Sequence, residues 1–211
     1  MDLFIVRHGE TEWNREGRIQ GHRDSPLTAR GVEQARAAAL RLASERPDAL
    51  YSSDLGRARQ TASEVALVTG LPVVYDAGLR ERAFGVHEGK TWDEIATQHP
   101  VDALLLKEDP EHQVPAGESL ARFRDRAIEA LRRIARDPRM ARVAVVTHGG
   151  VLSVLHREAM GIPLGAPRTW ATMNAVVNHF RYVEDRWAVV RWGDADHLPR
   201  GESLDDRDAP T

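Results

Sequence analysis

The sequence predicts an α/β fold, a three-layer sandwich whose mostly parallel central sheet carries helices on both faces and a small helical lid insertion. Two observations favour this fold. Short apolar runs alternate along most of the chain with longer segments of helical periodicity, an order that is typical of parallel sheets covered by helices. In addition, two of the apolar runs, about 140 residues apart, end in a histidine followed by glycine. Two buried strands that end alike are expected to meet at one edge of one sheet.

Six short apolar runs are expected to form the strands. They are residues 3–6, 49–51, 72–75, 143–147, 174–177 and 187–191. The first run, from Leu3 to Val6, contains no polar residue, which is typical of a strand buried on both faces. No helical segment separates the last two runs, so we expect them to form a hairpin at one edge of the sheet.

Helices are expected between most of these strands. They are predicted over residues 28–46, 57–69 and 118–136, and directly after Gly150. In the first of them Thr28 is an N-cap candidate, and apolar residues recur at helical spacing on one face. The residues on this face are Val32, Ala35, Ala39 and Leu42.

Residues 82–117 interrupt the alternation of strands and helices. Thr91 and Glu94 form a capping-box pattern that predicts a short helix, and the run from Val101 to Leu106 predicts another. The stretch 109–117 contains prolines and a glycine, as loops do. We interpret residues 82–117 as a lid-like insertion over the sheet edge.

Length and composition restrict the class of protein. The 211 residues suit one domain, which we expect to span residues 1–198, with a disordered tail at 199–211. The net charge of −3 and the lack of an uninterrupted basic tract argue against a nucleic-acid partner. No run approaches about 18 apolar residues, so no membrane span and no membrane partner are expected.

The N-terminus and the cysteine content bear on location. The first predicted strand begins at residue 3, so no signal peptide is expected. The sequence contains no cysteine, which excludes disulfides, thiolate metal sites and cysteine nucleophiles. We therefore expect a cytoplasmic protein.

The two strand-end histidines, His8 and His148, predict a site at the sheet edge. Together with Arg7 they would form a cluster that repels itself unless an anion is bound within it. Phosphate is the obvious anion, because a guanidinium group matches its oxygens. Backbone amides at a glycine-flanked helix start, here at Gly149, add further donors.

Further phosphate ligands are expected from two other segments. Arg57 follows the second predicted strand and should therefore emerge at the same sheet edge. The loop from Glu10 to His22 is rich in hydrogen-bonding side chains and poor in apolar ones. Both segments extend the predicted anion site beyond the two histidines.

Four sequence motifs carry a family resemblance. They are Arg7–Asn14, Ser52–Thr61, Leu79–Gly89 and Thr147–Gly150, and Pro115–Ser119 is similar to a common element of the same family. In their order and spacing they resemble the histidine phosphatase superfamily, also called the phosphoglycerate mutase-like family. The resemblance extends from residue 3 to about residue 197, and the segment 18–28 looks like the small phosphatase branch.

The resemblance implies catalytic roles for two residues. His8, neutral and with an unprotonated ring nitrogen, would attack phosphorus and form a phosphohistidine. Glu81 would protonate the leaving alcohol and then take a proton from the attacking water.

It also implies a set of residues that hold the phosphoryl group. Arg7, Arg57 and His148 would stabilise the equatorial oxygens in place of a metal ion, so no metal and no cofactor are expected. The full set of implied phosphate-binding residues is Arg7, Asn14, Gln20, Gly21, Arg57, His148 and Gly149.

Two reactions share such a site. A phosphatase transfers the phosphoryl group to water, whereas a mutase returns it to a second hydroxyl and needs a water-poor pocket and a bisphosphorylated primer. The insertion 82–117 has Arg82, Lys90 and Lys107 as its only basic residues, and its acidic residues outnumber them. This balance does not suit a tight grip on glycerate phosphates. We therefore predict a metal-independent phosphatase acting on small phosphomonoesters, with a small phosphorylated metabolite as its partner.

Several alternatives stay open at this stage. They are a cofactor-dependent phosphoglycerate mutase, a phosphate-ligand binding protein without turnover, and a metal-dependent hydrolase. The presence of both His8 and Glu81 argues against the binding protein. The sequence leaves open which phosphomonoester is used and whether the protein is a monomer or a homodimer.

The other conspicuous side chains are assigned to surface or packing roles. These are Arg59 and the histidines His22, His87, His99, His112, His156, His179 and His197. Trp92 is assigned to packing in the lid, with a role as a substrate platform left open.

Overall fold

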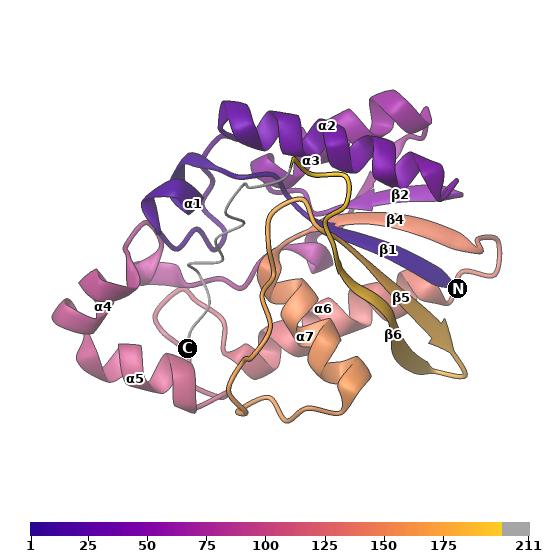
Figure 1. Cartoon of the computed structure of the whole chain (residues 1–211). Helices are drawn as coiled ribbons and strands as arrows, with labels where there is room; N and C mark the ends of the chain where they lie inside the picture. The colour runs from indigo at the N-terminus through magenta and orange to yellow at the C-terminus, as the bar shows by residue number, and fades with distance from the viewer. Residues whose placement is uncertain (200–211) are drawn as a thin grey trace.

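A six-stranded sheet forms the centre of the protein (Figure 1). The computed structural model describes residues 1–199. The strands are β1 (Asp2–Arg7), β2 (Ala49–Ser52), β3 (Val73–Tyr75), β4 (Arg142–Thr147), β5 (Val177–Val183) and β6 (Arg186–Asp194). The helices are α1 (Glu12–Glu16), α2 (Ala29–Ser44), α3 (Gly56–Thr69), α4 (Trp92–Gln98), α5 (Pro100–Glu108), α6 (Leu120–Ala135) and α7 (Gly149–Met160). Two 3₁₀ turns span Ala77–Leu79 and Gly85–His87.

The sheet is mostly parallel, as the sequence predicted. Its strand order is β3-β2-β4-β1-β5-β6. The pairs β2–β3, β2–β4 and β1–β4 are parallel, and β5 runs antiparallel to both of its neighbours. The predicted hairpin of the last two strands is confirmed at the β6 edge.

One predicted strand was misplaced. We expected residues 174–177, but β5 begins at Val177 and continues to Val183. Asn178 and His179 are both polar, and from His179 onward polar residues alternate with apolar ones, so the strand does not form an apolar run. The residues before it form a loop that turns at Ala175, whose φ is +59° and whose N–H donates to the carbonyl of Arg7 at 3.0 Å.

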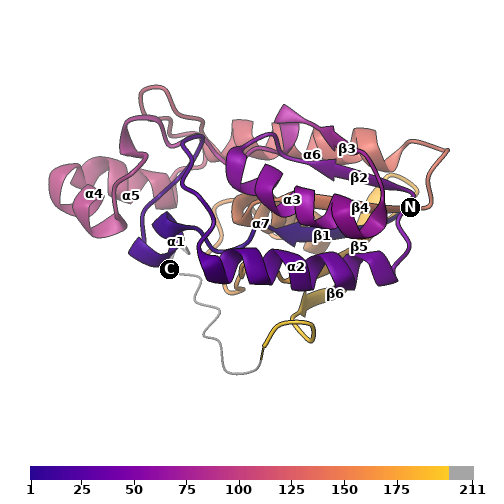
Figure 2. The same ribbon diagram turned by 90° about the horizontal axis from the view of Figure 1, so that it is seen from above.

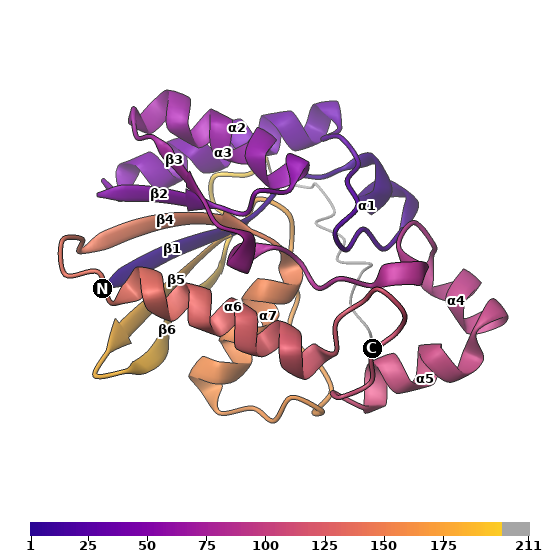
Figure 3. The ribbon, with the colours of Figure 1, turned by 180° about the vertical axis from the view of Figure 1, so that it is seen from behind.

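Helices cover both faces of the sheet and complete the predicted three layers. Helices α2 and α3 lie on one face, and α6 and α7 lie on the other (Figures 1 and 3). The apolar run of β1 serves both cores, because side chains of a strand alternate between its faces. Leu3 and Ile5 join the core under α6 and α7, whereas Phe4 and Val6 join the core under α2 and α3.

The predicted helix over residues 28–46 is confirmed as α2. Its N-cap is Thr28, whose side chain accepts the N–H of Gly31 at 2.9 Å. On its inner face Ala35, Ala39 and Leu42 are fully buried, while Val32 is half-buried.

The insertion contains the two short helices that the sequence predicted. Helix α4 has the capping box formed by Thr91 and Glu94, and α5 follows it directly. Both lie beyond the carboxyl ends of the central strands, on the opposite side of the molecule from the N-terminus (Figure 2). The predicted tail at 199–211 lies, apart from the exposed Pro199, outside the described residues.

No helix among residues 1–199 is both long enough and apolar enough to span a bilayer.

The register between β1 and β4 positions the site. Arg7 is paired with Thr147, so the residues that follow, His8 and His148, leave the sheet side by side. The N–H of His8 donates to the carbonyl of Thr147 at 2.9 Å and continues the ladder by one residue. The two histidines, far apart in the sequence, are therefore fixed by backbone pairing.

The core under α6 and α7 allows a prediction of the stability of a variant. Leu131 on α6 is fully buried, whereas Leu40 on α2 is 65% exposed. Leu131→Ala should lower the free energy of unfolding by about 2–5 kcal/mol, because it leaves a cavity that the packed sheet face cannot close. Leu40→Ala is the matched control and should change it by less than about 0.5 kcal/mol. Urea unfolding followed by circular dichroism measures both, and equal effects would contradict the layer assignment.

Candidate active site

Two buried histidines lie at the centre of the site. The His8 and His148 rings have centroids 5.2 Å apart and are tilted by 60°. Their residues are 2% and 0% exposed. Burial, followed by the positive charges of Arg57 and Arg7, holds the pKa of His8 well below its usual value of 6.5. Burial and then Arg57 lower the pKa of His148 in the same way.

The tautomer of His8 is fixed by its hydrogen bonds. Its Nδ1 lies 2.8 Å from the carbonyl oxygen of Gly9 and must donate to it, since a carbonyl only accepts. The Nε2 atom accepts from Nε of Arg57 at 3.2 Å. The free electron pair of the ring is therefore on Nε2.

Arg57 is held in place by a carboxylate from the loop after β1. Its Nη1 donates to Oδ1 of Asp24 at 2.8 Å, and its Nη2 donates to the carbonyl of Gly21 at 2.8 Å. The other carboxylate oxygen of Asp24 accepts the N–H of Gly56 at 2.6 Å. Asp24 thus caps the first turn of α3 and orients Arg57, which is 1% exposed, toward His8.

Arg7 and His148 are also anchored by neighbouring loops. The Nη1 atom of Arg7 donates to the carbonyl of Thr172 at 2.6 Å. The Nε2 atom of His148 lies 2.8 Å from the hydroxyl of Ser53, which follows β2. Asn174 donates from Nδ2 to the carbonyl of His8 at 2.9 Å. These contacts leave little freedom to the side chains at the strand ends.

Glu81 brings a carboxylate to the same edge. Its Oε1 accepts the N–H of Arg82 at 2.8 Å, and its Oε2 accepts the N–H of Gly150 at 3.0 Å. A β-carbon at position 150 would lie only 2.1 Å from Oε1, so any other residue there would displace the Glu81 carboxylate. His22 donates from Nε2 to the carbonyl of Glu81 at 2.9 Å. This packing role is the one that the sequence assigned to His22.

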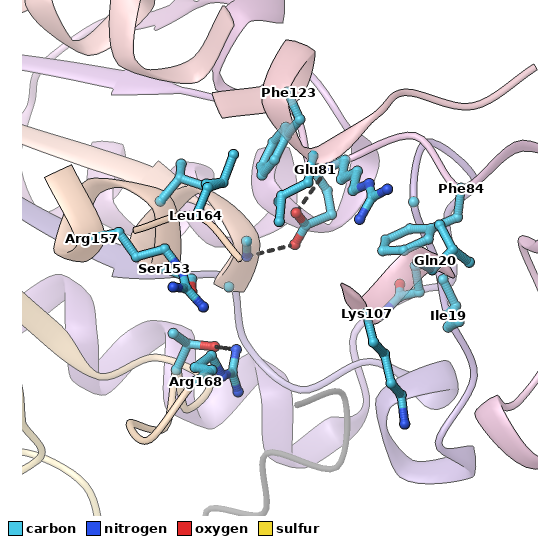
Figure 4. Close-up of a pocket in the computed structure, with 18 of the residues that line it drawn as sticks. Ile19, Gln20, Glu81, Phe84, Lys107, Phe123, Ser153, Arg157, Leu164 and Arg168 are labelled. Carbon is cyan, nitrogen blue, oxygen red and sulfur yellow. Dashed lines mark hydrogen bonds between the residues drawn. The ribbon is translucent and has the colours of Figure 1, made fainter. Parts of the chain in front are cut away.

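These groups open onto a cavity of about 460 Å³. Figure 4 shows the Glu81 carboxylate turned toward this cavity. Among the described residues, six cations and two carboxylates line it; the cations are Arg7, Arg57, Arg82, Lys107, Arg157 and Arg168, and the carboxylates are Glu81 and Glu108. Apolar side chains form much of the remaining wall; they are Ile19, Phe84, Trp92, Leu106, Leu120, Phe123, Val154 and Leu164. The cavity therefore suits an anion that carries an apolar part.

The structure brings most of the predicted site residues together. Those that line the cavity are Arg7, His8, Gln20, Gly21, Arg57, Glu81 and Gly149, and His148 lies directly behind His8. Asn14 is not among the lining residues; its Oδ1 accepts from the N–H of Thr11 in the capping box of α1. Its role in phosphate binding stays a prediction. Trp92 both lines the cavity and packs edge-to-face on Phe84, with centroids 6.2 Å apart.

Several site residues were missed from the sequence. They are Ser53, Asp24, Thr172, Asn174, Arg157 and Arg168. Ser53 lies within one of the motifs, so that motif could have indicated it. Asp24 lies within the segment 18–28, which also carries the family resemblance. The remaining four come from the loop after α7 or from the last turns of α7, and no motif marks them in the sequence. Arg59 is exposed, as predicted.

No group of three or more histidine, aspartate or glutamate side chains in residues 1–199 is arranged to hold a metal ion.

Comparisons with known proteins agree with this geometry. The family model of the histidine phosphatase superfamily (branch 1) matches residues 3–195. A relative from Salmonella paratyphi C, named "Probable phosphoglycerate mutase GpmB", is 35% identical over 204 residues, which cover 94% of this chain and 95% of the relative. Bacillus stearothermophilus YhfR has a similar structure, with a TM-score of 0.86, 34% identity, and coverage of 94% of this chain and 99% of that one.

A second solved structure has a phosphatase name. It is the mycobacterial glucosyl-3-phosphoglycerate phosphatase in a complex with VO3, with a TM-score of 0.81 and 31% identity. The similarity covers 92% of this chain and 98% of that chain. The relatives thus include proteins named as phosphatases and proteins named as mutases.

The match spans nearly the whole sequence and includes the strand ends at which the two histidines meet. The fold, the paired histidines and the relatives agree with the resemblance seen in the sequence motifs. The chain therefore belongs to branch 1 of the histidine phosphatase superfamily.

Proposed function

We propose that the protein is a phosphatase that hydrolyses small phosphomonoesters through a phosphohistidine on His8. This proposal rests on the tautomer of the His8 ring. Because Nδ1 donates to the carbonyl of Gly9, the lone pair is on Nε2, beside Arg57. A neutral imidazole with this orientation is a nucleophile without further activation.

The reaction has two displacement steps. In the first, Nε2 of His8 attacks phosphorus, the bond between phosphorus and the alcohol oxygen breaks, and Glu81 gives a proton to that oxygen. In the second, the Glu81 carboxylate takes a proton from water, whose oxygen attacks phosphorus as the phosphorus–nitrogen bond breaks. Inorganic phosphate leaves, and both residues return to their starting states.

Fixed cations stabilise the transferring group. Arg7 and Arg57 are almost fully buried, so their charges act with little screening. Removing one such donor typically costs about 10²–10³ in kcat.

The Ser53 hydroxyl sets the role of His148. It accepts the N–H of Leu55 at 3.3 Å and can donate its own proton to Nε2 of His148, which lies 2.8 Å away. The ring proton is then expected on Nδ1, which has no hydrogen-bond partner in residues 1–199. In the proposed reaction this nitrogen would donate to a phosphoryl oxygen once the substrate is bound.

A mutase is the second candidate, favoured by the Salmonella relative, which is named a probable phosphoglycerate mutase. The same His8 and Glu81 would return the phosphoryl group to a second hydroxyl of the substrate. Proton NMR of a reaction with 3-phosphoglycerate and catalytic 2,3-bisphosphoglycerate separates the two activities. Accumulation of 2-phosphoglycerate would establish the mutase, whereas accumulation of glycerate and inorganic phosphate would support the phosphatase.

The nucleophile can be tested by substitution. His8→Ala should lower phosphate release from small phosphomonoesters by at least about 10³-fold, because no other nucleophile is present at this position. The assay is run in a chelator and should be unaffected by it. Arg59→Ala is the control, since Arg59 is an exposed arginine two residues from Arg57. Activity in His8→Ala, or activity abolished by the chelator in the wild type, would contradict the proposal.

The two roles of Glu81, as proton donor and as proton acceptor, can be separated by comparing esters with different leaving groups. Glu81→Gln should lower kcat/KM for alkyl phosphates by about 10²–10⁴-fold, because their alkoxide needs a proton. With p-nitrophenyl phosphate, whose leaving group is stable as an anion, the first step should survive while hydrolysis of the phosphohistidine is slow. A stopped-flow burst of nitrophenolate close to one equivalent of enzyme is the expected signature. Equal losses for both ester classes without a burst would contradict the assignment.

The protonation state of His8 gives a prediction of pH dependence. Its pKa is lowered in the folded protein, so the ring stays neutral at pH 6.5 and takes up a proton only at lower pH. The Hε1 resonance of His8, assigned with a His8→Gln variant, should therefore have its NMR titration midpoint below 6.5. Inorganic phosphate should raise that midpoint, because the anion offsets the charges of Arg7 and Arg57. A midpoint at or above 6.5 without phosphate would show that the surroundings of His8 do not lower its pKa.

A further inference from the structure

One arginine holds the backbone segment that ends in Glu81. Arg126, on α6, donates from Nη1 to the carbonyls of Gly78 at 2.9 Å and Arg80 at 3.1 Å. Its Nη2 donates to the carbonyl of Glu81 itself, also at 3.1 Å. A guanidinium group is planar and rigid, so three carbonyls that accept from it are fixed relative to one another. Arg126 therefore sets the path of the chain directly before the Glu81 side chain.

A carboxylate holds Arg126 in this orientation. Glu118 accepts from Nε of Arg126 at 2.9 Å through Oε1 and from Nη2 at 2.8 Å through Oε2, which is a bidentate ion pair. Its Oε2 also accepts the N–H of Ala83, two residues after Glu81, at 3.0 Å. Burial raises the pKa of Glu118, but the hydrogen bonds from Arg126 and Ala83 hold it below the usual value of 4.5. We call Arg126 and Glu118 the clamp pair.

The segment before Glu81 lies between α6 and the end of β4. A β-carbon at Gly78 would lie 2.6 Å from the β-carbon of Ala130, so this turn packs directly on α6. The hydroxyl of Thr147, the last residue of β4, donates to the carbonyl of the fully buried Leu79 at 2.8 Å. The segment is thus fixed to α6 by the clamp pair and to the edge of the sheet by Thr147.

The carboxylate of Glu81 itself is held only by backbone N–H groups among residues 1–199. These are the N–H groups of Arg82 and Gly150. The other ionisable side chains of the elements packed around it are Arg7, His8, His22, Arg57, Arg80, Arg82 and His148, and the carboxylates Asp24 and Asp54, which are paired with Arg57 and Arg80. Arg126 adds a further cation to these surroundings, and Glu118 cancels it. The clamp pair therefore holds the backbone without adding net charge beside the carboxylate.

We propose that Arg126 is a positioning residue for Glu81 in proton transfer, and that Glu118 cancels the charge that Arg126 brings. This inference rests on the proposed phosphatase function and adds two residues to it. Glu118 belongs to the segment Pro115–Ser119, for which the family resemblance implied no role. Proton transfer requires the carboxyl group within hydrogen-bond reach of the ester oxygen, and a misplacement of about 1 Å can cost about 10²-fold in rate.

Two esters with different leaving groups test the positioning. Arg126→Gln should lower kcat/KM for hexyl phosphate by about 10–10²-fold, because the alkoxide needs a correctly placed proton donor. With p-nitrophenyl phosphate, whose leaving group needs no proton, kcat/KM should fall by less than about threefold. Arg126→Lys should restore part of the loss for hexyl phosphate, since an ammonium group can donate to some of the same carbonyls.

A second arginine on the same helix provides the control. Arg122 is exposed and lies one turn earlier on α6, so Arg122→Gln should leave kcat/KM for both esters unchanged. Equal losses for the two esters in Arg126→Gln would be a structural effect and would overturn the inference. So would a kcat/KM for hexyl phosphate that Arg126→Gln leaves unchanged.

The pH dependence tests the charge compensation. Glu118→Gln is close in shape and leaves Arg126 its contacts with the carbonyls, but the cation is then uncompensated. Such a cation favours the ionised carboxylate of Glu81, so the ratio of kcat/KM between hexyl phosphate and p-nitrophenyl phosphate should decline at lower pH than in the wild type. Arg126→Gln leaves the charge of Glu118 and should move this decline to higher pH. Shifts in the same direction, or no shift, would overturn the inference.

Carbon NMR keeps the inference separate from the proposed function. The carboxyl carbon of Glu81 is followed in the His8→Ala protein, in which no turnover is expected, and is assigned with Glu81→Gln. Its titration midpoint should be lower when Glu118→Gln is added and higher when Arg126→Gln is added. This result would support the clamp pair even if the wild type hydrolysed neither ester. Hydrolysis of both esters, with a midpoint that neither substitution moves, would instead leave the phosphatase standing and remove the role of the clamp pair.

Discussion

The parallel pairing of β1 with β4 is the constraint on which the site depends. It sets Arg7 opposite Thr147 and thereby places His8 next to His148. A strand pair slipped by one residue would turn every side chain to the opposite face, so it would exchange the two cores and separate the histidines at once. The apolar residues of β1 enter both cores and resist such a slip. The packing that stabilises the fold is therefore the same packing that fixes the site.

Four basic side chains, His8, His148, Arg7 and Arg57, are buried at the strand ends, and they are accommodated in two different ways. The histidines are held neutral, since burial and the neighbouring arginines lower the pKa of each. The arginines stay charged, and their donors are directed to oxygens: Arg57 to Asp24 and Gly21, and Arg7 to the carbonyl of Thr172. Buried charges need such partners. In the proposed reaction a phosphoryl group would thus meet charges that are already oriented, with little reorganisation.

Different parts of the cavity wall would serve the reaction and the selection of the substrate. In the proposed reaction the groups at the strand ends and Glu81, which contacts Gly150, act on phosphorus and on the alcohol oxygen, and the first turn of α7 lines this end. The later turns of α7, the loop after it and the insertion form the rest of the wall. Such loops can change without disturbing the strand pairing. This division fits a family whose members are named for different reactions, such as a glucosyl-3-phosphoglycerate phosphatase and a probable phosphoglycerate mutase.

The sequence by itself determined the sheet, the three layers, the insertion with its two helices, and the residues at the strand ends. It could do so because apolar runs, helical periodicity and a capping box are local patterns. It misplaced β5, because that strand alternates polar and apolar residues and begins beyond the loop at Ala175. Only the tertiary structure decided that Asp24 orients Arg57, that Ser53 contacts His148, and that Thr172 accepts from both Arg7 and Arg168. Each of these contacts joins segments whose approach follows from strand order and loop closure, which no short stretch of sequence encodes.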